Sequence, residues 1–363
     1  MFRRQVRART LSVIVAVATL SLAPTTATAQ IPDYQFAGPV FGIDTAPDGS
    51  LLVADGGAGI VEFRKGVGSL VVDLPGVADM SPVGRNSGWA ITFSGDVATE
   101  QPPSAWDVHQ IHNGRAVFVA DLLAFEKANN PDGGTDPVEG INSNPYDVVA
   151  LNASTALVAD AGGNDVLIVD HKGNVDWIAV LPPELVSTAN LQSLLNCPDV
   201  PVELSFLAFV CGVEMLPAES VPTSIAIGPD GAYYVAELKG FPAPTNESRI
   251  WRIEPGTRHF LCQNDPAPTD PCQIVADGFT AIVNLRFGPD GTLYVTELDE
   301  ASWAFEFGLA TQGGTVNACN VMTWSCSVLA GDLVLPTATA VGRDGTVYVV
   351  VDALANPTVI ALP

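Results

Sequence analysis

The chain has 363 residues, with 16 basic and 40 acidic side chains and a formal net charge of −24. A surface this acidic repels phosphate backbones and anionic headgroups, which argues against nucleic acid as a partner. Hydrophobic residues make up 47% of the chain and charged residues only 15%, which is ample material for a core and argues against intrinsic disorder.

The first residues are typical of an export signal. A basic start with four arginines is followed by an apolar run from Leu11 to about Ala23 and by the small residues Ala27 to Ala29. This pattern predicts a signal peptide over residues 1–29 and a secreted or periplasmic mature chain that starts at Gln30. The apolar run is shorter than the roughly 20 residues that span a bilayer, so we expect no membrane span after cleavage. An uncleaved anchor is the alternative.

A decapeptide recurs along the rest of the chain. Each copy has an alternating apolar run, a turn and a second run that mostly ends in an acid, and Asp-Gly between two such runs is a strong hairpin signal. Clear copies are APDGSLLVAD at Ala46 to Asp55, GPDGAYYVAE at Gly228 to Glu237, GPDGTLYVTE at Gly288 to Glu297 and GRDGTVYVVV at Gly342 to Val351. A fifth lies at Pro145 to Asp160, where Asn152 to Ser154 replace the turn, and a worn sixth lies at Trp89 to Asp96.

Six copies predict an all-β, six-bladed β-propeller of the NHL or TolB type. They are spaced at intervals of about 47 to 77 residues, and a four-stranded blade needs about 40 to 50. The C-terminal Thr358 to Pro363 is short for a complete blade, so we expect the segment near Phe36 to Val40 to supply the missing strand and close the ring. A β-sandwich with accidental repeats is the alternative.

Residues 30–363 are predicted to form a single propeller with a cysteine-bearing insertion near 183–220. The six cysteines fall into sequence-local pairs that bracket loops, which favours disulfides Cys197–Cys211, Cys262–Cys272 and Cys319–Cys326 among the fifteen possible connectivities. Metal binding by these thiols is the alternative, but the chain has no Cys-x-x-Cys pair.

Several motifs resemble the ScyD/ScyE family of exported, NHL-like propeller proteins, which is named after members encoded beside genes for the pigment scytonemin. The motifs are ANNPDGG at Ala128 to Gly134, SNPYDVVAL at Ser143 to Leu151, LVADAGGNDVLIVD at Leu157 to Asp170, VPTSIAIGPDGAYYVAELKGFP at Val221 to Pro242, and FGPDGTLYVTE. The resemblance implies a fold and an exported location, and it implies no particular reaction.

Polar residues are predicted to gather at one rim of the propeller. Aligned on the turn, the innermost strands place Gly42, Ala90, Asp147, Ser224, Asn284 and Ala338 at one level, and the partner strands end in Asp55, Asp160, Glu237, Glu297 and Asp352. Oxygen ligands suit Ca²⁺, and calcium-dependent propeller hydrolases such as gluconolactonases and paraoxonases hold a metal with inner-strand acids and asparagines. The candidate calcium ligands are therefore Asp147, Asn284, Ser224, Glu237 and Glu297. Alternatively, the strand-ending acids only accept backbone hydrogen bonds and fix the blades.

The sequence favours a binding or scaffold module for an unidentified protein or small-molecule ligand. No nucleophilic-serine elbow, P-loop or dinucleotide fingerprint occurs, and no catalytic residues can be assigned. A calcium-dependent lactone or ester hydrolase with its site in the central funnel is the main alternative. A quinoprotein-like dehydrogenase is less favoured, because no positioned group of His and Arg residues emerges.

Overall fold

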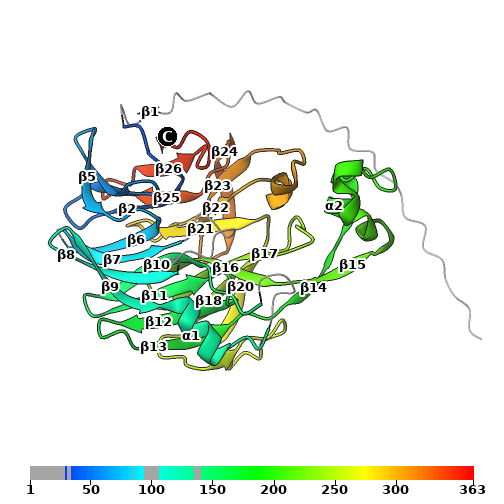
Figure 1. The fold of residues 1–363 in the computed structure, drawn as a ribbon, viewed down its shortest axis with the longest axis horizontal. Helices are drawn as coiled ribbons and strands as arrows, with labels where there is room; N and C mark the ends of the chain where they lie inside the picture. Colours follow the sequence, from blue (N-terminus) through cyan, green and yellow to red (C-terminus); the bar gives the residue numbers. More distant parts are fainter. Residues whose placement is uncertain (1–28, 31–33, 85, 94–105, 135–139) are drawn as a thin grey trace, which may run out of the picture.

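The computed structural model describes residues 29–30, 34–84, 86–93, 106–134 and 140–363. Six mainly antiparallel sheets are arranged around a central axis as the blades of a β-propeller, which confirms the predicted fold. In Figure 1 the colours run in order around the molecule, and the blue first blade lies beside the red last blade. Among the described residues, no helix is both long and apolar enough to cross a membrane.

Each blade is given from its innermost strand outward. The first blade comprises β2 (Val40–Thr45), β3 (Leu51–Asp55), β4 (Gly59–Arg64) and β5 (Val67–Asp73). The second comprises β6 (Val77–Gly84), β7 (Ser87–Thr92), β8 (Asp107–His112) and β9 (Arg115–Asp121). The third comprises β10 (Pro145–Asn152), β11 (Thr155–Asp160), β12 (Asp165–Asp170), β13 (Val175–Val180) and β19 (Phe260–Leu261). The fourth comprises β16 (Ser220–Ile227), β17 (Tyr233–Lys239), β18 (Ser248–Ile253) and β20 (Cys272–Phe279). The fifth comprises β21 (Ile282–Phe287), β22 (Leu293–Glu297), β23 (Gly314–Asn320) and β24 (Ser325–Leu333). The sixth comprises β25 (Ala338–Val341), β26 (Val347–Val351), β27 (Thr358–Leu362) and β1 (Ala29–Gln30).

The repeated Asp-Gly turns connect the first and second strands of four blades. In the turn before β22, Gly291 has φ 85°, a conformation that favours glycine, and Asp290 accepts a hydrogen bond from the Thr292 amide at 3.0 Å. The third blade uses Asn152 instead, whose side chain accepts from the Ser154 amide at 2.7 Å. The same local chemistry therefore sets the same hairpin in blades with different turn sequences.

The second blade corrects the predicted register. Its innermost strand is β6, so the strand that contains Trp89 and Ala90 is the second strand and not the first. The connection runs between Gly84 and Ser87 and lacks the Pro-Asp-Gly signature, while the alternating run of β7 imitates an inner strand. Asp79, rather than Ala90, consequently occupies the inner position; Gly95, the expected turn marker, lies outside the described residues.

An N-terminal strand completes the last blade, as predicted, but its position differs. β1 pairs antiparallel with β27, with Ala29 opposite Ala361 and Gln30 opposite Ile360. The expected segment, Phe36 to Val40, was wrong: Val40 begins the first blade, and the Phe36 ring packs against Phe63 with centroids 6.2 Å apart. Phe36 is partly buried and Val40 is buried in a hydrophobic cluster formed with residues of the first and last blades.

Segments inserted between the blade strands extend from the ring. The longest forms a two-stranded arm of β14 (Glu184–Ser187) and β15 (Met215–Ala218) that carries α2 (Ala189–Leu194) and the 3₁₀ helix η1 (Val202–Gly212), and it projects from the ring in Figure 1. Helix α1 (Leu122–Asn129) connects the second and third blades, and η2 (Ser302–Phe307) follows β22. All three predicted disulfides are present: Cys197–Cys211, Cys262–Cys272 and Cys319–Cys326.

Candidate functional site

The innermost strands hold six equivalent residues around the central funnel. Each pairs with a residue near the end of the second strand, and in the first five blades a β-bulge immediately before it re-aims the side chain. The six are Gly42, Asp79, Asp147, Ser224, Asn284 and Ala338. The sequence prediction identified five of these positions, and Asp79 is the residue that it missed.

Four of these side chains, Asp79, Asp147, Ser224 and Asn284, form what we call the inner belt. Each accepts a hydrogen bond from a backbone amide of the next blade. The bonds are Val148 N to Asp79 Oδ2 at 3.1 Å, Ile225 N to Asp147 Oδ2 at 3.0 Å, Leu285 N to Ser224 Oγ at 3.0 Å and Thr339 N to Asn284 Oδ1 at 3.0 Å. The inner belt thus joins adjacent blades through backbone amides of their inner strands.

Arg286 brings a positive charge to the inner belt. Its Nη1 lies 3.4 Å from Asp147 Oδ2, and its Nη2 lies 3.9 Å from Asp79 Oδ2. Burial, and then the neighbouring Asp147 carboxylate, raise the pKa of Asp79 well above its usual range, while Arg286 opposes the shift. Two buried acids therefore share one buried guanidinium at the centre of the propeller.

The structure separates the five predicted calcium ligands into two groups. Asp147, Ser224 and Asn284 lie on the inner belt, where the Ser224 hydroxyl donates to Asp147. Glu237 and Glu297 lie at the ends of second strands, where protein donors occupy their carboxylates. Glu297, for example, accepts hydrogen bonds from Thr315 Oγ1 at 3.0 Å and from the Asn317 amide group.

In the first and third blades, the acid that ends the second strand anchors the segment that enters the blade. Asp55 accepts from the Ala37 and Gly38 amides at 2.8 and 2.9 Å. Asp160 accepts from the Asn144 amide at 2.6 Å and from the Ser143 hydroxyl at the same distance. These contacts give such acids a structural role at the funnel face, as the alternative interpretation of the sequence expected.

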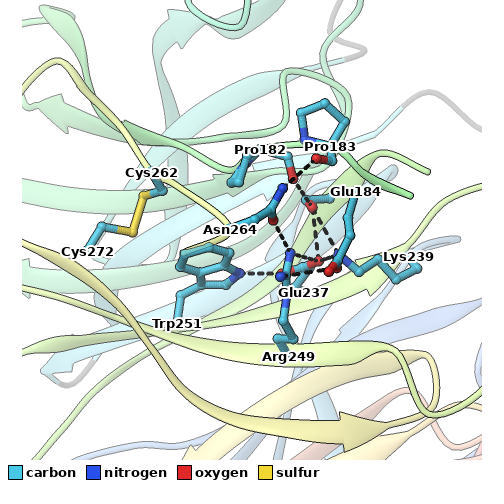
Figure 2. Close-up of polar contacts among 11 residues, drawn as sticks. Pro182, Pro183, Glu184, Glu237, Lys239, Arg249, Trp251, Cys262, Asn264 and Cys272 are labelled. Atoms are coloured by element: carbon cyan, nitrogen blue, oxygen red, sulfur yellow. Dashed lines mark hydrogen bonds and ion pairs between the residues drawn. A yellow bond between two sulfur atoms is a disulfide. The ribbon is translucent and has the colours of Figure 1, made fainter. Parts of the chain in front are cut away.

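Glu237 has the most elaborate partners, and Figure 2 shows them converging on its carboxylate. Arg249 Nε lies 3.0 Å from Glu237 Oε2, and Lys239 pairs with both Glu237 and Glu184, the latter at 2.9 Å. Trp251 Nε1 also donates to Glu237. Two acids and two bases, three of them almost completely buried, therefore balance each other's charge within this corner of the fourth blade.

A cavity of about 280 Å³ lies at the mouth of the funnel. Several of its walls come from residues that immediately precede the inner positions, and its lining is largely aromatic and aliphatic: Phe41, Ala78, Phe93, Asn144, Pro145, Tyr146, Leu298, Phe305, Glu306, Leu335, Thr337 and Leu354. The Phe41 ring lies 5.5 Å from that of Phe93 and 6.3 Å from that of Tyr146. Burial, and then the Glu306 carboxylate, raise the pKa of Tyr146, so its hydroxyl stays a neutral donor.

One group of acids among the described residues could hold a metal ion, and it lies outside the inner belt. One ligand oxygen from each of Glu126, Asp160 and Asp165 lies within 4.8 Å of the other two. The sequence prediction placed Asp160 at the rim but missed Glu126 and Asp165. Strand register could have identified Asp165, because it lies opposite Asp160 across β11 and β12. The fourth blade has Arg249 at the equivalent position, and the fifth has Thr315.

Comparisons with known proteins support the fold. No family model matches the chain, and no curated protein matches it. A glucose dehydrogenase structure is 10% identical with a TM-score of 0.55, covering 93% of this chain and 99% of that one. The soluble aldose sugar dehydrogenase of Escherichia coli (11%, TM-score 0.52, coverage 93% and 99%) and a gluconolactonase of Xanthomonas campestris (11%, TM-score 0.50, coverage 92% and 89%) are also similar. Structures such as these are six-bladed propellers, and at this identity the likeness extends to the fold alone.

Proposed function

We propose that the protein is an exported propeller that binds a small, mainly apolar ligand at the mouth of its funnel. The observation that carries this proposal is the cavity of about 280 Å³, which approaches the size range of small-molecule sites and combines aromatic walls with a few polar groups. Glu306 and the overall charge of −24 favour a neutral or cationic ligand over an anionic one.

Export is supported by the predicted signal peptide and by the three disulfides, which are typical of oxidising compartments. Residues 1–28 lie outside the described residues. The ScyD/ScyE-like motifs support the same class of exported, NHL-like propeller, and they include the strand that contributes Tyr146 to the cavity.

Ligand binding is favoured over calcium-dependent lactone or ester hydrolysis in the funnel. Hydrolysis of that kind needs a cation near Asp147, and Arg286 already supplies a positive charge to this carboxylate at 3.4 Å. Two of the other predicted ligands, Glu237 and Glu297, are held by Arg249 and Thr315 away from the inner belt. Loss of stoichiometric calcium binding in Asp147→Asn alone would favour the hydrolase.

Fluorescence titration with the neutral hydrophobic dye N-phenyl-1-naphthylamine tests the proposal. We expect saturable binding to the wild-type protein that weakens at least about tenfold in Ala78→Leu, which fills the cavity, because ligand affinity depends on enclosed apolar surface. Ala267→Leu, on an exposed loop, is the matched control and should bind as the wild type does. Equal dye binding by all three proteins would refute the proposal, provided their melting temperatures agree.

A further inference from the structure

The acids Glu126, Asp160 and Asp165, called here the blade-three cluster, lie where α1 meets the third blade. Glu126 lies on α1, Asp160 ends β11 and Asp165 begins β12. Gly163 lies between them: a Cβ atom at this glycine would be 3.3 Å from both Glu126 Oε1 and Asp165 Oδ1. Carboxylate oxygens from two separate elements therefore crowd around one stretch of backbone.

Most oxygens of the blade-three cluster have no protein partner. Both carboxylate oxygens of Glu126 and both of Asp165 are buried and accept no hydrogen bond from any described residue. These side chains are only 1% and 0% exposed. Buried carboxylates are normally paired or bound to a metal, because leaving them without a partner is costly.

Asp160 differs from its two neighbours because its oxygens are satisfied. The Gly162 and Gly163 amides donate to Oδ1 at 3.0 and 3.1 Å, in addition to the donors from Ser143 and Asn144. The adjacent Asn164 adds an independent observation: its side chain is 8% exposed, and its Oδ1 has no partner among the described residues. The unsatisfied oxygens thus come from three residues, not from Asp160.

The other blades show what is missing at this corner. In the fourth blade the equivalent acid, Glu237, is paired with Arg249 near the start of the third strand. In the fifth blade Glu297 faces Thr315, which donates a hydrogen bond to it. In the third blade the residue opposite Asp160 is another acid, Asp165.

The neighbouring charges do not neutralise the cluster. The charged groups that act on Glu126 are the acids Asp160 and Asp132, and those that act on Asp165 are Glu126, Asp160 and Asp132. Asp132 is itself held by the Asn164 side chain, whose Nδ2 lies 3.1 Å from Asp132 Oδ2. No positively charged group of the described residues is among those that act on Glu126 or Asp165.

We propose that the blade-three cluster binds a calcium ion that joins α1 to the third blade. Its donors are all oxygens, with no His or Cys in the group, which suits a hard cation and not zinc. A small polar cavity of about 70 Å³ lies beside the cluster and is lined by Gly163 and Asn164 but not by the three acids. Calcium accepts several carboxylates in irregular geometry, whereas magnesium demands a near-ideal octahedron.

Calorimetric titration of the chelator-treated protein with CaCl₂, together with thermal unfolding in CaCl₂ or in EDTA, tests this proposal. We expect one calcium per chain and a melting temperature about 3 °C or more higher with calcium. Glu126→Gln and Asp165→Asn should each weaken binding at least about tenfold, since each replaces a charged carboxylate ligand by a neutral amide. Asp147→Asn in the funnel, the matched control, should bind as the wild type does.

The melts in EDTA separate a lost site from a damaged fold. Without metal, the Glu126→Gln and Asp165→Asn proteins should melt higher than the wild type, because each removes an unpaired buried acid. The proposal is overturned if the wild type binds no calcium, if both variants bind it as the wild type does, or if Asp147→Asn is the variant that loses it. Variants that lose binding and also melt lower than the wild type in EDTA would likewise overturn it, as would an equal response to MgCl₂.

Discussion

Blades three and four each contain an equivalent buried acid, and they surround it with side chains of opposite charge. Each has a buried acid at or near the end of its second strand, Asp160 or Glu237, that anchors the entering segment. In blade four the acid is surrounded by Lys239 and Arg249, whereas in blade three it is joined by Asp165 and Glu126. The two acids occupy equivalent positions, so the side chains around them, above all the residue near the start of the third strand, decide whether the local charge is balanced.

In blade four the acidic side chains have protein partners and stabilise the fold, whereas in blade three they have oxygens left to bind a ligand. Polar contacts alone do not distinguish them, because both acids accept several hydrogen bonds. The distinction lies in the surrounding oxygens: those of Glu184 and Glu237 are paired, and those of Glu126 and Asp165 are not. Variants that exchange or remove single groups can test this distinction, and the largest effect is expected in blade four.

Glu237→Gln should destabilise the protein by about 3 to 5 kcal/mol, because it leaves the buried Lys239 and Arg249 with only the partly exposed Glu184 as a shared carboxylate. Urea unfolding at neutral pH measures the change. Arg252→Ala removes ion pairs with Asp230 and Glu254 at the surface of the same blade and should cost less than about 1 kcal/mol. Similar costs for both variants would show that the buried network contributes no more than a surface pair.

Asp165→Thr gives blade three the residue that blade five has at this position. In EDTA it should stabilise the protein by about 1 to 3 kcal/mol, because an unpartnered buried acid is replaced by a potential donor to Asp160. The reciprocal change, Thr315→Asp, should destabilise the protein, since it places an acid opposite Glu297. Urea unfolding in EDTA compares the two, and effects of the same sign would contradict the comparison.

Blade two offers a milder version of the acidic corner, in Asp107 at the start of β8. Burial, and then the nearby Asp121, raise the pKa of Asp107 to about 6. The folded state thus keeps this proton longer than the unfolded chain, whose pKa is near 3.9, and stability from this group is lost as pH rises from about 4 to about 6.

Asp107→Asn should therefore be more stable than the wild type at pH 7, by on the order of 1 kcal/mol after allowance for solvent screening, and about equal to it at pH 4. Urea unfolding at the two pH values measures the difference. A stability difference between the two proteins that is the same at both pH values would show that the charge of Asp107 is not its cause.

Gly163→Ala probes the blade-three cluster without changing its charge and should have the smallest effect. The added methyl group would sit 3.3 Å from Glu126 Oε1 and Asp165 Oδ1, so those side chains must give way slightly. We expect calcium affinity to fall a few-fold by calorimetry. Gly212→Ala, where the methyl group meets no atom within 4 Å, is the matched control, and an equal loss there would contradict the assignment.

The fold could be predicted from the sequence because its signals are local. The Asp-Gly turns at Asp48, Asp230, Asp290 and Asp344 repeat in register, and each sets a hairpin through contacts within a few residues. The second blade lacks this turn, and its register and Asp79 were missed for that reason. The disulfides were predictable for the same reason as the turns, since each closes a short local loop.

The candidate sites were harder to predict because they depend on contacts between distant segments. Arg286 follows a recognised inner position by two residues, but its pairing with Asp147 spans 139 positions of sequence. Glu126 reaches Asp160 and Asp165 only because α1 lies against the third blade. Register alone could have marked Asp165 as unusual, whereas nothing in the local sequence of α1 marks Glu126.

Blades three and four are physically connected through a shared strand. β19 belongs to the loop between β18 and β20 of blade four, yet it extends blade three by pairing parallel to β13. The adjacent Cys262 forms a disulfide with Cys272 at the start of β20, which links β19 covalently to blade four. Blade four cannot unravel without taking an edge strand from blade three, so the two should open as one cooperative unit in hydrogen exchange.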